Sequence, residues 1–401
     1  MTITWPAMPT QRPTKFDPPP IYGELRDEAP VIRVRFPAGM EGWLVTRFDD
    51  VAAAFRHPAF AAARPRYESA DADPTGKTPT PFAGTFVHLD GPDHTAYRRL
   101  LGGRFTVPGV RRQLQPFIER TVAERLNAIE AGPRTFDLVR DFALAVPCLV
   151  ICELLGVPYA DRDAFHAASL KIMDFRLPQA ERDGERQWIL DYIRDLLGRK
   201  RAAGDSTGLL GEMLGEIDSG AAFFTDEDLV KVGGLLLVAG HDTTANMISL
   251  SLLSMLTRPE HRRFVLENPD KLDAVVEELL RFLSIVHFGL GRTVVADTEF
   301  QGVRMKKGEL VVVSLVAANR DPRRFEDPEL LDFDRQTMRH MAFGLGAHQC
   351  IGQNIARAEL RAVIPAVLRR FPDLRLAVTL DDVPMHSHST NYGVESLMVT
   401  R

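Results

Sequence analysis

The apolar positions of the chain concentrate in one stretch, residues 225–257. It opens with Thr225 and three acidic residues, which is typical of a helix start because threonine caps the first turn and acids favour its positive end. Residues 232–240 are all apolar or glycine, and residues 247–256 are nearly all apolar or serine. A helix that is apolar on every side lies in a core or in a membrane. The polar residues 241–246 at its centre, and the lack of a second such stretch, indicate a long buried helix in a globular protein.

Shorter patterned segments flank this helix on both sides. Apolar residues at helical spacing predict further helices, at residues 49–56, 110–201 (with short breaks), 272–283 and 360–368. Apolar and β-branched runs bounded by glycines predict strands, at residues 31–36 and 43–46 (a hairpin), 293–296, 303–314 (paired strands) and 374–400. The chain is therefore predicted to be mainly α-helical with a smaller β-rich region.

Two segments lack such periodicity. Residues 1–20 contain six prolines and are expected to form an extended Pro-rich arm on the surface. Residues 62–84 are rich in Pro, Thr, Asp and Ser, and unstructured loops of this length are often lids over binding sites. Residues 21–401 are expected to form a single domain.

Composition narrows the class of protein. With 45% hydrophobic residues the chain can bury a large core, and its net charge of −5 does not favour a nucleic-acid partner. Three cysteines fit a reducing compartment, and Cys148 and Cys152 lie one helical turn apart, which suits packing better than a disulfide. Residues 1–20 contain no apolar run typical of a signal peptide or membrane anchor. A cytoplasmic protein that does not bind membranes is expected.

Candidate chemistry lies first at Cys350, which follows a glycine-studded turn and precedes a predicted helix. Gly344 and Gly346 allow backbone conformations that other residues avoid. The positive end of the new helix is expected to favour the thiolate form of Cys350. A thiolate in such a loop is a metal ligand, or a nucleophile with His348 as its base, and spacing alone does not separate the two.

Asp242 and Thr243 interrupt the long buried helix at its centre. A buried carboxylate costs several kcal/mol unless it has partners or takes up a proton. Thr243 can donate back to the carbonyl of Ala239 or Gly240, and Gly240 would permit a bulge that opens a groove. The alternative is a salt-bridged aspartate beside an N-cap-like threonine.

Two further pairs share a helix face. His94 and Arg98 are four residues apart and suit a pair of carboxylates, although a solvated basic face is the alternative. Glu278 and Arg281 are three residues apart beside an apolar stripe, a pattern that many surface helices also carry.

The loop has the pattern FGxGxHxCxG, and it resembles the haem-binding loop of the cytochrome P450 family. The matching residues are Phe343, Gly344, Gly346, His348, Cys350 and Gly352. The resemblance implies the cytochrome P450 fold over residues 21–401, with a long central helix over haem b. It also implies that Cys350 is the axial thiolate of the haem iron and that His348 binds a haem propionate.

The resemblance extends to the central helix. Residues 239–244 resemble the family's oxygen-activating motif. This implies that Ala239 and Gly240 border the haem, and that Asp242 and Thr243 deliver protons above the iron.

Outside these two motifs the resemblance implies supporting residues. His94, Arg98 and Arg292 are expected to bind haem propionates. Glu278 and Arg281 resemble the family's structural Glu-x-x-Arg pair, and Arg335 is expected as the partner of Glu278. The family usually has a proline shortly after this pair, where this chain has residues 284–286 instead.

The resemblance implies a haem-thiolate monooxygenase that inserts one oxygen atom of O2 into a C–H bond. Its substrate is expected to be a medium-to-large lipophilic molecule, in bacterial secondary metabolism, because the expected pocket wall is apolar: Leu235, Val238, Ala239, Val286, Phe288 and Val394. Since the sequence contains no GxGxxG motif or reductase domain, electrons are expected from a separate ferredoxin and ferredoxin reductase. The protein is expected to be a monomer.

Three other functions are compatible with a haem-thiolate loop. An oxidative coupling enzyme could keep the acid–threonine pair, whereas a peroxygenase should lack it. A haem sensor or electron carrier would be no enzyme and would need no such pair in a buried helix. Asp242 and Thr243 therefore favour the monooxygenase.

Overall fold

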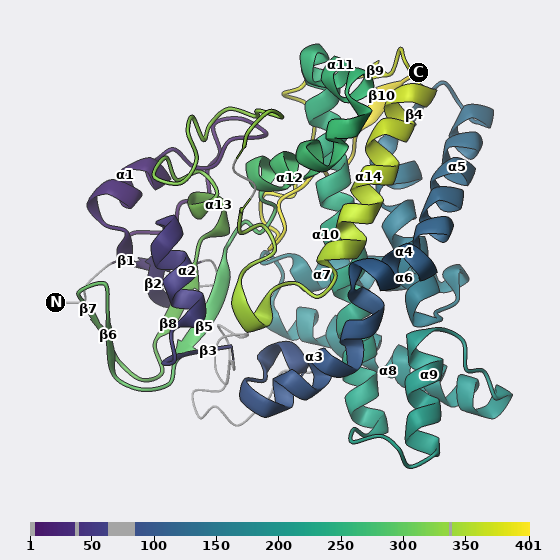
Figure 1. The fold of residues 1–401 in the computed structure, drawn as a ribbon, viewed down its shortest axis with the longest axis horizontal. Coiled ribbons are helices and arrows are strands. Elements are labelled where there is room, and N and C mark those ends of the chain that lie inside the picture. The colour runs from purple at the N-terminus through teal and green to yellow at the C-terminus, as the bar shows by residue number, and fades with distance from the viewer. Residues whose placement is uncertain (1–4, 37–39, 63–84, 337–338) are drawn as a thin grey trace.

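The computed structural model describes residues 5–36, 40–62, 85–336 and 339–401. Figure 1 shows a smaller β-rich part beside a larger helical part, with α10 (Asp226–Thr257) running through the helices. The predicted lid falls almost entirely on residues 63–84, outside the described residues. In the described ranges, no helix combines the length and hydropathy that a lipid bilayer requires.

The β-rich part is built on one mixed sheet with the strand order β1-β2-β8-β5-β3. Its strands are β1 (Val31–Arg35), β2 (Glu41–Val45), β3 (Phe60–Ala61), β5 (Leu290–Val294) and β8 (Leu310–Val313). The predicted hairpin is present, since β1 and β2 pair antiparallel with Val31 opposite Val45. Three helices accompany the sheet: α1 (Ile21–Glu28), α2 (Phe48–Arg56) and α13 (Leu315–Ala318).

The prediction of paired strands within residues 303–314 is wrong in its pairing. β7 (Val303–Met305) pairs with β6 (Thr298–Phe300) in a separate two-stranded sheet, whereas β8 pairs with β5 and β2. The strand predicted at 293–296 begins earlier, at Leu290, so Arg292 lies inside β5. Short strands do not reveal their partners in sequence, because pairing is decided by neighbours far along the chain.

The helical part contains most of the chain. Its elements before α10 are α3 (Gly91–Phe105), α4 (Val107–Gln113), α5 (Gln115–Ala131), α6 (Ala145–Leu155), α7 (Arg162–Met173), α8 (Gln179–Ala203) and α9 (Gly208–Asp218). After it come α11 (Pro259–Glu267), α12 (Leu272–Leu283) and α14 (Gln353–Arg370). Short 3-10 helices lie at Phe86–His88, Tyr159–Asp161, Pro269–Lys271 and Gly346–His348, and a π-helix at Val139–Ala143.

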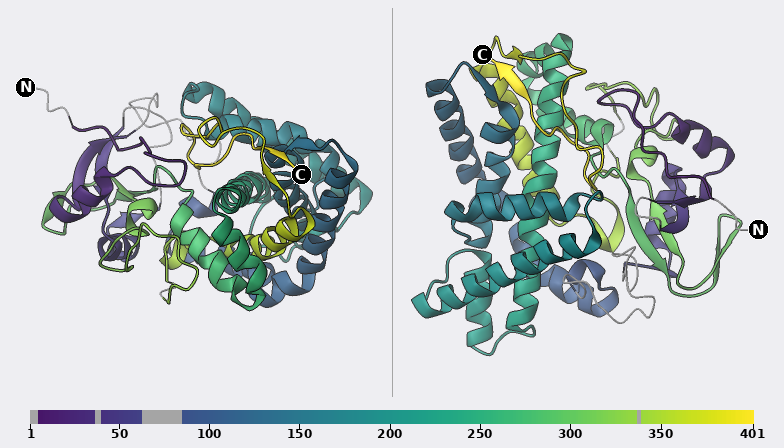
Figure 2. Two further views of the ribbon diagram at one scale, coloured as in Figure 1. Left: turned by 90° about the horizontal axis from the view of Figure 1, so that it is seen from above. Right: turned by 180° about the vertical axis from the view of Figure 1, so that it is seen from behind.

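The long helix predicted from the apolar pattern is confirmed. Thr225 and Asp228 form a reciprocal capping box at its start, and most of its residues are buried. α10 contacts α6, α8 and α14, and the left view of Figure 2 shows it surrounded by other helices. Its position at the centre places Asp242 and Thr243 inside the protein.

The two ends of the chain pair with strands elsewhere in the fold. β4 (Thr135–Asp137), which sequence did not predict, pairs with β10 (Met398–Thr400), and β10 pairs with β9 (Arg375–Leu376). The rest of the predicted β-rich end is mainly turns. The N-terminal arm lies against β1, where Met8 N–H donates to the Arg35 carbonyl at 2.8 Å.

Candidate functional site

The loop that carries Cys350 is a tight turn built on two glycines. Gly344 and Gly346 have φ of +70° and +77°, a left-handed conformation that other residues rarely adopt. The Cys350 N–H donates to the Phe343 carbonyl at 2.9 Å, which closes the loop. Since α14 begins at Gln353, the sulfur lies at the N-terminus of a long helix.

The surroundings of the Cys350 sulfur have opposing effects on the pKa of its thiol. Burial raises the pKa of the thiol and outweighs the groups that favour the thiolate: the N–H groups of Gly352 and Gln353, and the charges of Arg98 and Arg357. The start of α14 therefore favours the thiolate, as predicted, but burial outweighs this effect in the protein alone. A metal cation reverses this balance, because a coordinating thiol loses its proton.

One face of α10 is accessible deep in the helical part. Leu235, Gly240 and Thr243 are half-buried and Ala239 is exposed, while most other residues of this helix are buried. Residues 235, 239 and 243 are four apart and share one face. Cys350 is exposed as well, although burial dominates the pKa of its sulfur. The protein thus leaves space at α10 and at the Cys350 loop, which fits a flat prosthetic group bound through the sulfur.

Basic side chains from three elements gather near this loop: His94 and Arg98 from α3, Arg292 from β5, and His348 from the loop. The rings of His94 and His348 stack with centroids 4.0 Å apart, and the charges of Arg98 and Arg292 both act on His348. Burial is the main cause that lowers the pKa of both histidines, to about 4 for His94. Because two guanidinium groups repel each other and the histidine rings can donate hydrogen bonds, this group suits an anionic ligand such as the carboxylates of a porphyrin.

Asp90 belongs to this cluster, although the sequence did not point to it. Its Oδ1 lies 3.0 Å from His348 Nε2, and its Oδ2 accepts a hydrogen bond from the Ala62 N–H at 2.9 Å. In sequence Asp90 is only an acid before a Gly-Pro helix start, a position where it would cap the helix. Its pairing with His348 joins residues far apart in the chain and has no local signal.

The acid and the alcohol of α10 make different contacts. Thr243 Oγ1 donates to the Ala239 carbonyl at 2.8 Å, one of the two acceptors that the sequence suggested. The helix nevertheless stays regular, without the bulge expected at Gly240. A Cβ at Gly240 would lie 2.6 Å from Ile151 Cδ1, so this glycine lets α10 pack closely on α6. The carboxylate of Asp242 is 6% exposed and accepts a hydrogen bond from Asn391 Nδ2 at 2.8 Å.

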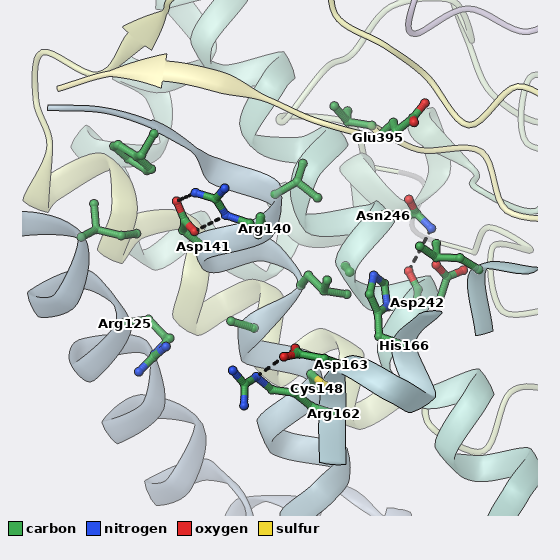
Figure 3. A pocket seen from close by; sticks show the side chains of 18 of the residues that line it. Arg125, Arg140, Asp141, Cys148, Arg162, Asp163, His166, Asp242, Asn246 and Glu395 are labelled. Atoms are coloured by element: carbon green, nitrogen blue, oxygen red, sulfur yellow. Dashed lines mark hydrogen bonds and ion pairs between the residues drawn. The ribbon is translucent and has the colours of Figure 1, made fainter. Parts of the chain in front are cut away.

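A cavity of about 770 Å³ reaches Asp242 from the side of α5, α6 and α7. Figure 3 shows its outer wall with charged side chains such as Arg140 and Arg162, and its inner end with His166, Asp242 and Asn246. The lining mixes charged and apolar side chains, and its charged groups can bind water. The cavity therefore connects Asp242 with polar surroundings.

The expected pocket residues lie in several places. Leu235 and Ala239 lie on the accessible face of α10, whereas Val238 is buried in the main core. Val286 is half-buried and forms a β-bridge with Asn391, and Val394 lines the cavity beside Asp242. Phe288 lies elsewhere, in a groove beside the N-terminal arm, where its ring contacts Phe175. Val394 thus lines the same cavity as Asp242, whereas Phe288 lines a different groove.

Glu278 and Arg281 form a buried ion pair with two short contacts, both of 2.7 Å. Arg335 Nε also lies 3.1 Å from Glu278 Oε1, the partner that the sequence suggested. Arg281 further donates to the carbonyls of Asn319, Pro328 and Leu330. These contacts join α12 to the segment that leads into the Cys350 loop.

A second acid on α12 was not predicted. Glu277 accepts from the guanidinium of Arg357 in α14 and lies 3.1 Å from His340 Nε2. Burial alone would raise the pKa of Glu277, but the hydrogen bonds from Arg357 and His340 lower it to about 2. Arg357 also lies over the ring of Phe343, 4.6 Å from its centroid. The two acids together hold both sides of the Cys350 loop.

Known proteins match this chain over nearly its whole length. Residues 186–390 match the family model of cytochrome P450. Cytochrome P450-SU2 of Streptomyces griseolus is 38% identical over 395 residues, which cover 96% of this chain and 94% of that protein. Vitamin D3 dihydroxylase of the same species is 36% identical over 415 residues, covering 100% and 98%.

Solved structures agree as well. The crystal structure of CYP105P1 in complex with filipin I has a TM-score of 0.91 and 38% sequence identity, and covers 99% of this chain and 98% of that one. Matches of this length and identity, together with a cysteine loop and acid–alcohol helix in one fold, identify the protein. The chain belongs to the cytochrome P450 family and is a monooxygenase.

Proposed function

We propose that this enzyme hydroxylates a C–H bond of a medium-to-large lipophilic molecule in bacterial secondary metabolism, with haem b as cofactor. The observation that carries the proposal is Thr243 on the accessible face of α10, with the buried Asp242 next to it in sequence. Relatives support the substrate class, since one is named for vitamin D3 and a related structure holds filipin I. The cytoplasmic location and the monomeric state stay predictions.

Haem bound through Cys350 would supply oxygen activation and the oxidation of the C–H bond. The residues His94, Arg98, Arg292 and His348 would hold its carboxylates and so fix its orientation. Ala239 leaves room beside α10, because its side chain is a single methyl group, whereas Gly240 lets α10 pack closely on α6.

The protein's own task is to supply protons to the site. Asp242 takes up a proton from water in the adjoining cavity and passes it on along α10. Thr243 Oγ1 is the next hydroxyl, and its hydrogen bond to Ala239 must break before its proton can move outward. A carboxylate and a hydroxyl in this order deliver protons one at a time and keep bulk water away.

The proposed reaction can be tested with a panel of terpenoids, macrolides and aromatic compounds. The haem-loaded protein is first titrated with each compound, and those that shift its haem spectrum are incubated with ferredoxin, reductase, NADPH and isotopically labelled O2. We expect one labelled oxygen atom in the product of at least one compound. A product joined by a new bond without added oxygen would instead favour oxidative coupling. Turnover with peroxide but not with NADPH would favour a peroxygenase.

A separate ferredoxin is the proposed electron donor, docking on the side of the Cys350 loop. Arg99, Arg111 and Arg112 are exposed there, and Val107 beside them is 51% exposed. Arg104, in the same helix as Arg99, is half-buried and paired with Glu212. Exposed cations around an apolar residue suit a small acidic partner, because rim charges steer association and apolar contact holds it.

Charge reversal tests this docking surface. In the double variant Arg111→Glu and Arg112→Glu, we expect reduction by ferredoxin to slow by about tenfold at low salt, with a smaller difference at high salt. Stopped-flow reduction at several salt concentrations measures this. Arg304→Glu is the matched control, since Arg304 is 90% exposed on β7. An unchanged rate and salt dependence in the double variant would exclude this surface.

A further inference from the structure

The buried carboxylate of Asp242 is held by a residue from the far end of the chain. We propose that Asn391 is a positioning residue for Asp242, and that Gly393 is the residue that lets its segment reach α10. The inference rests on the proposed role of Asp242 as a proton donor. It concerns how that carboxylate is oriented and kept ready to take up a proton.

The contact between Asn391 and Asp242 is direct and buried. Asn391 Nδ2 donates to Asp242 Oδ2 at 2.8 Å, and the two residues are 5% and 6% exposed. A hydrogen bond to a carboxylate stabilises its charged form. An amide does so without a positive charge, so the acid can still gain and lose a proton, which a buried salt bridge would oppose.

Backbone hydrogen bonds fix the segment that carries Asn391. Asn391 forms an antiparallel β-bridge with Val286, the Tyr392 N–H donates to the Ile285 carbonyl at 2.7 Å, and the His287 N–H donates to the Thr390 carbonyl at 3.0 Å. The segment is thereby tied to the residues that follow α12. Its approach to α10 is set by this pairing and not by Asn391 alone.

Gly393 allows the closest approach of this segment to α10. A Cβ at position 393 would lie 1.8 Å from Asn246 Oδ1 and 2.7 Å from Asn246 Cβ, so no other residue fits without a shift. Asn246 lies one turn after Asp242 and donates to its backbone carbonyl at 3.0 Å. The segment therefore packs directly against the turn of α10 that carries Asp242.

The N-terminal arm holds the same segment from outside. The guanidinium of Arg12 lies over the Tyr392 ring, 3.9 Å from its centroid, and 3.4 Å from His287 Nδ1. Tyr392 follows Asn391 directly. The Asn391 amide is thus placed against the Asp242 carboxylate by contacts among three parts of the chain: the N-terminal arm, the residues after α12 and the C-terminal segment.

Other ionisable groups surround Asp242 and must be considered in any pH experiment. Those that face it or line the adjoining cavities are His241 on α10, Cys148 on α6, Asp163, His166 and Lys171 on α7, Asp174 and Arg176 after it, His386, His388 and Glu395 in the C-terminal segment, and Arg125, Arg140, Asp141, Tyr159 and Arg162 at the outer wall. Burial lowers the pKa of His166 to about 4, which keeps it neutral near neutral pH. Because these groups are common to all variants, the test compares variants with one another.

The test is an infrared pH titration of the buried carboxyl in full-length, haem-loaded protein. The band of Asp242 is identified by its loss in Asp242→Asn. In Asn391→Ala we expect the protonation midpoint of this band to move up by about one pH unit, because the carboxylate loses its donor. In Asn391→Asp we expect a larger upward shift, because two adjacent carboxylates share a proton. Thr379→Ala removes a hydrogen bond to Asp382 in the same C-terminal segment and should leave the midpoint unchanged.

Gly393→Ala should give the same shift as Asn391→Ala, whereas Gly215→Ala, where a Cβ meets nothing, should not. An unchanged midpoint in Asn391→Ala overturns the inference. Peroxide formed per NADPH, measured on the same variants, separates the inference from the proposed function. If Asp242→Asn raises this ratio and Asn391→Ala has no effect on ratio or midpoint, only the inference fails. If Asp242→Asn leaves the ratio unchanged, the proton-donor role of Asp242 fails instead.

Discussion

Replacing Cys350 with serine is expected to abolish monooxygenase turnover. The two side chains have nearly the same size, so the loop closed by the Cys350 N–H and the Phe343 carbonyl should persist. The hydroxyl of serine does not ionise near neutral pH and cannot replace a thiolate as the ligand that promotes O–O cleavage. The amides of Gly352 and Gln353 would then donate to a neutral oxygen. Turnover is measured with a substrate found in the panel, at matched haem content.

The control for this variant is a thiol that lies away from the site. Cys152→Ala removes a buried thiol of α6 that is 3% exposed, and it should keep both haem and turnover. If the serine variant of Cys350 turns over at the rate of the unmodified enzyme, the cysteine loop is not the haem ligand. The resemblance of this loop to the haem-binding loop of the family would then not support the proposed function.

Thr243→Ala is expected to separate oxygen consumption from product formation. Haem binding and the spectral response to substrate should persist, because the Thr243 hydroxyl donates to its own helix at Ala239. Without that hydroxyl the proposed proton path from Asp242 is interrupted, and reducing equivalents should be lost as hydrogen peroxide. Product formed per NADPH should fall on the order of a hundredfold, the range typical of a lost proton-transfer group.

Thr257 on the same helix offers a matched control. Its hydroxyl donates back to the Leu253 carbonyl at 2.9 Å, nearly the same geometry as Thr243, but it lies at the end of α10. Thr257→Ala removes the same kind of intrahelical bond and should leave coupling unchanged. Unchanged coupling in Thr243→Ala as well would show that its hydroxyl takes no part in proton delivery.

Features that depend on residues close together in the sequence could be predicted from it. α10 follows from its apolar run and from the capping box at Thr225. The buried pair Glu278 and Arg281 was expected from its resemblance to the family's Glu-x-x-Arg pair, since many surface helices carry the same spacing. The Cys350 loop follows from its glycines and from its position before a helix. In each case the residues that carry the pattern lie within a few turns of one another.

Two contacts between distant residues had no signal in the sequence. Asp90 meets His348 across 258 residues, and Asn391 meets Asp242 across 149. Their side chains are ordinary polar residues until the fold brings them together, so sequence offers no local sign of the contact. The contact of Arg335 with Glu278 also joins distant residues, and it was expected only from the family resemblance. The partner of β7 was predicted wrongly, because strand pairing depends on neighbours far along the chain.

The central claim is that the sulfur of Cys350 binds haem iron. The most direct measurement is the absorption spectrum of the purified, reduced protein under carbon monoxide. The account predicts a Soret band shifted far to longer wavelength, because a thiolate donates electron density through the iron. A Soret band at the position typical of histidine-ligated haem, or a protein that stays colourless after haem supplementation, would contradict it.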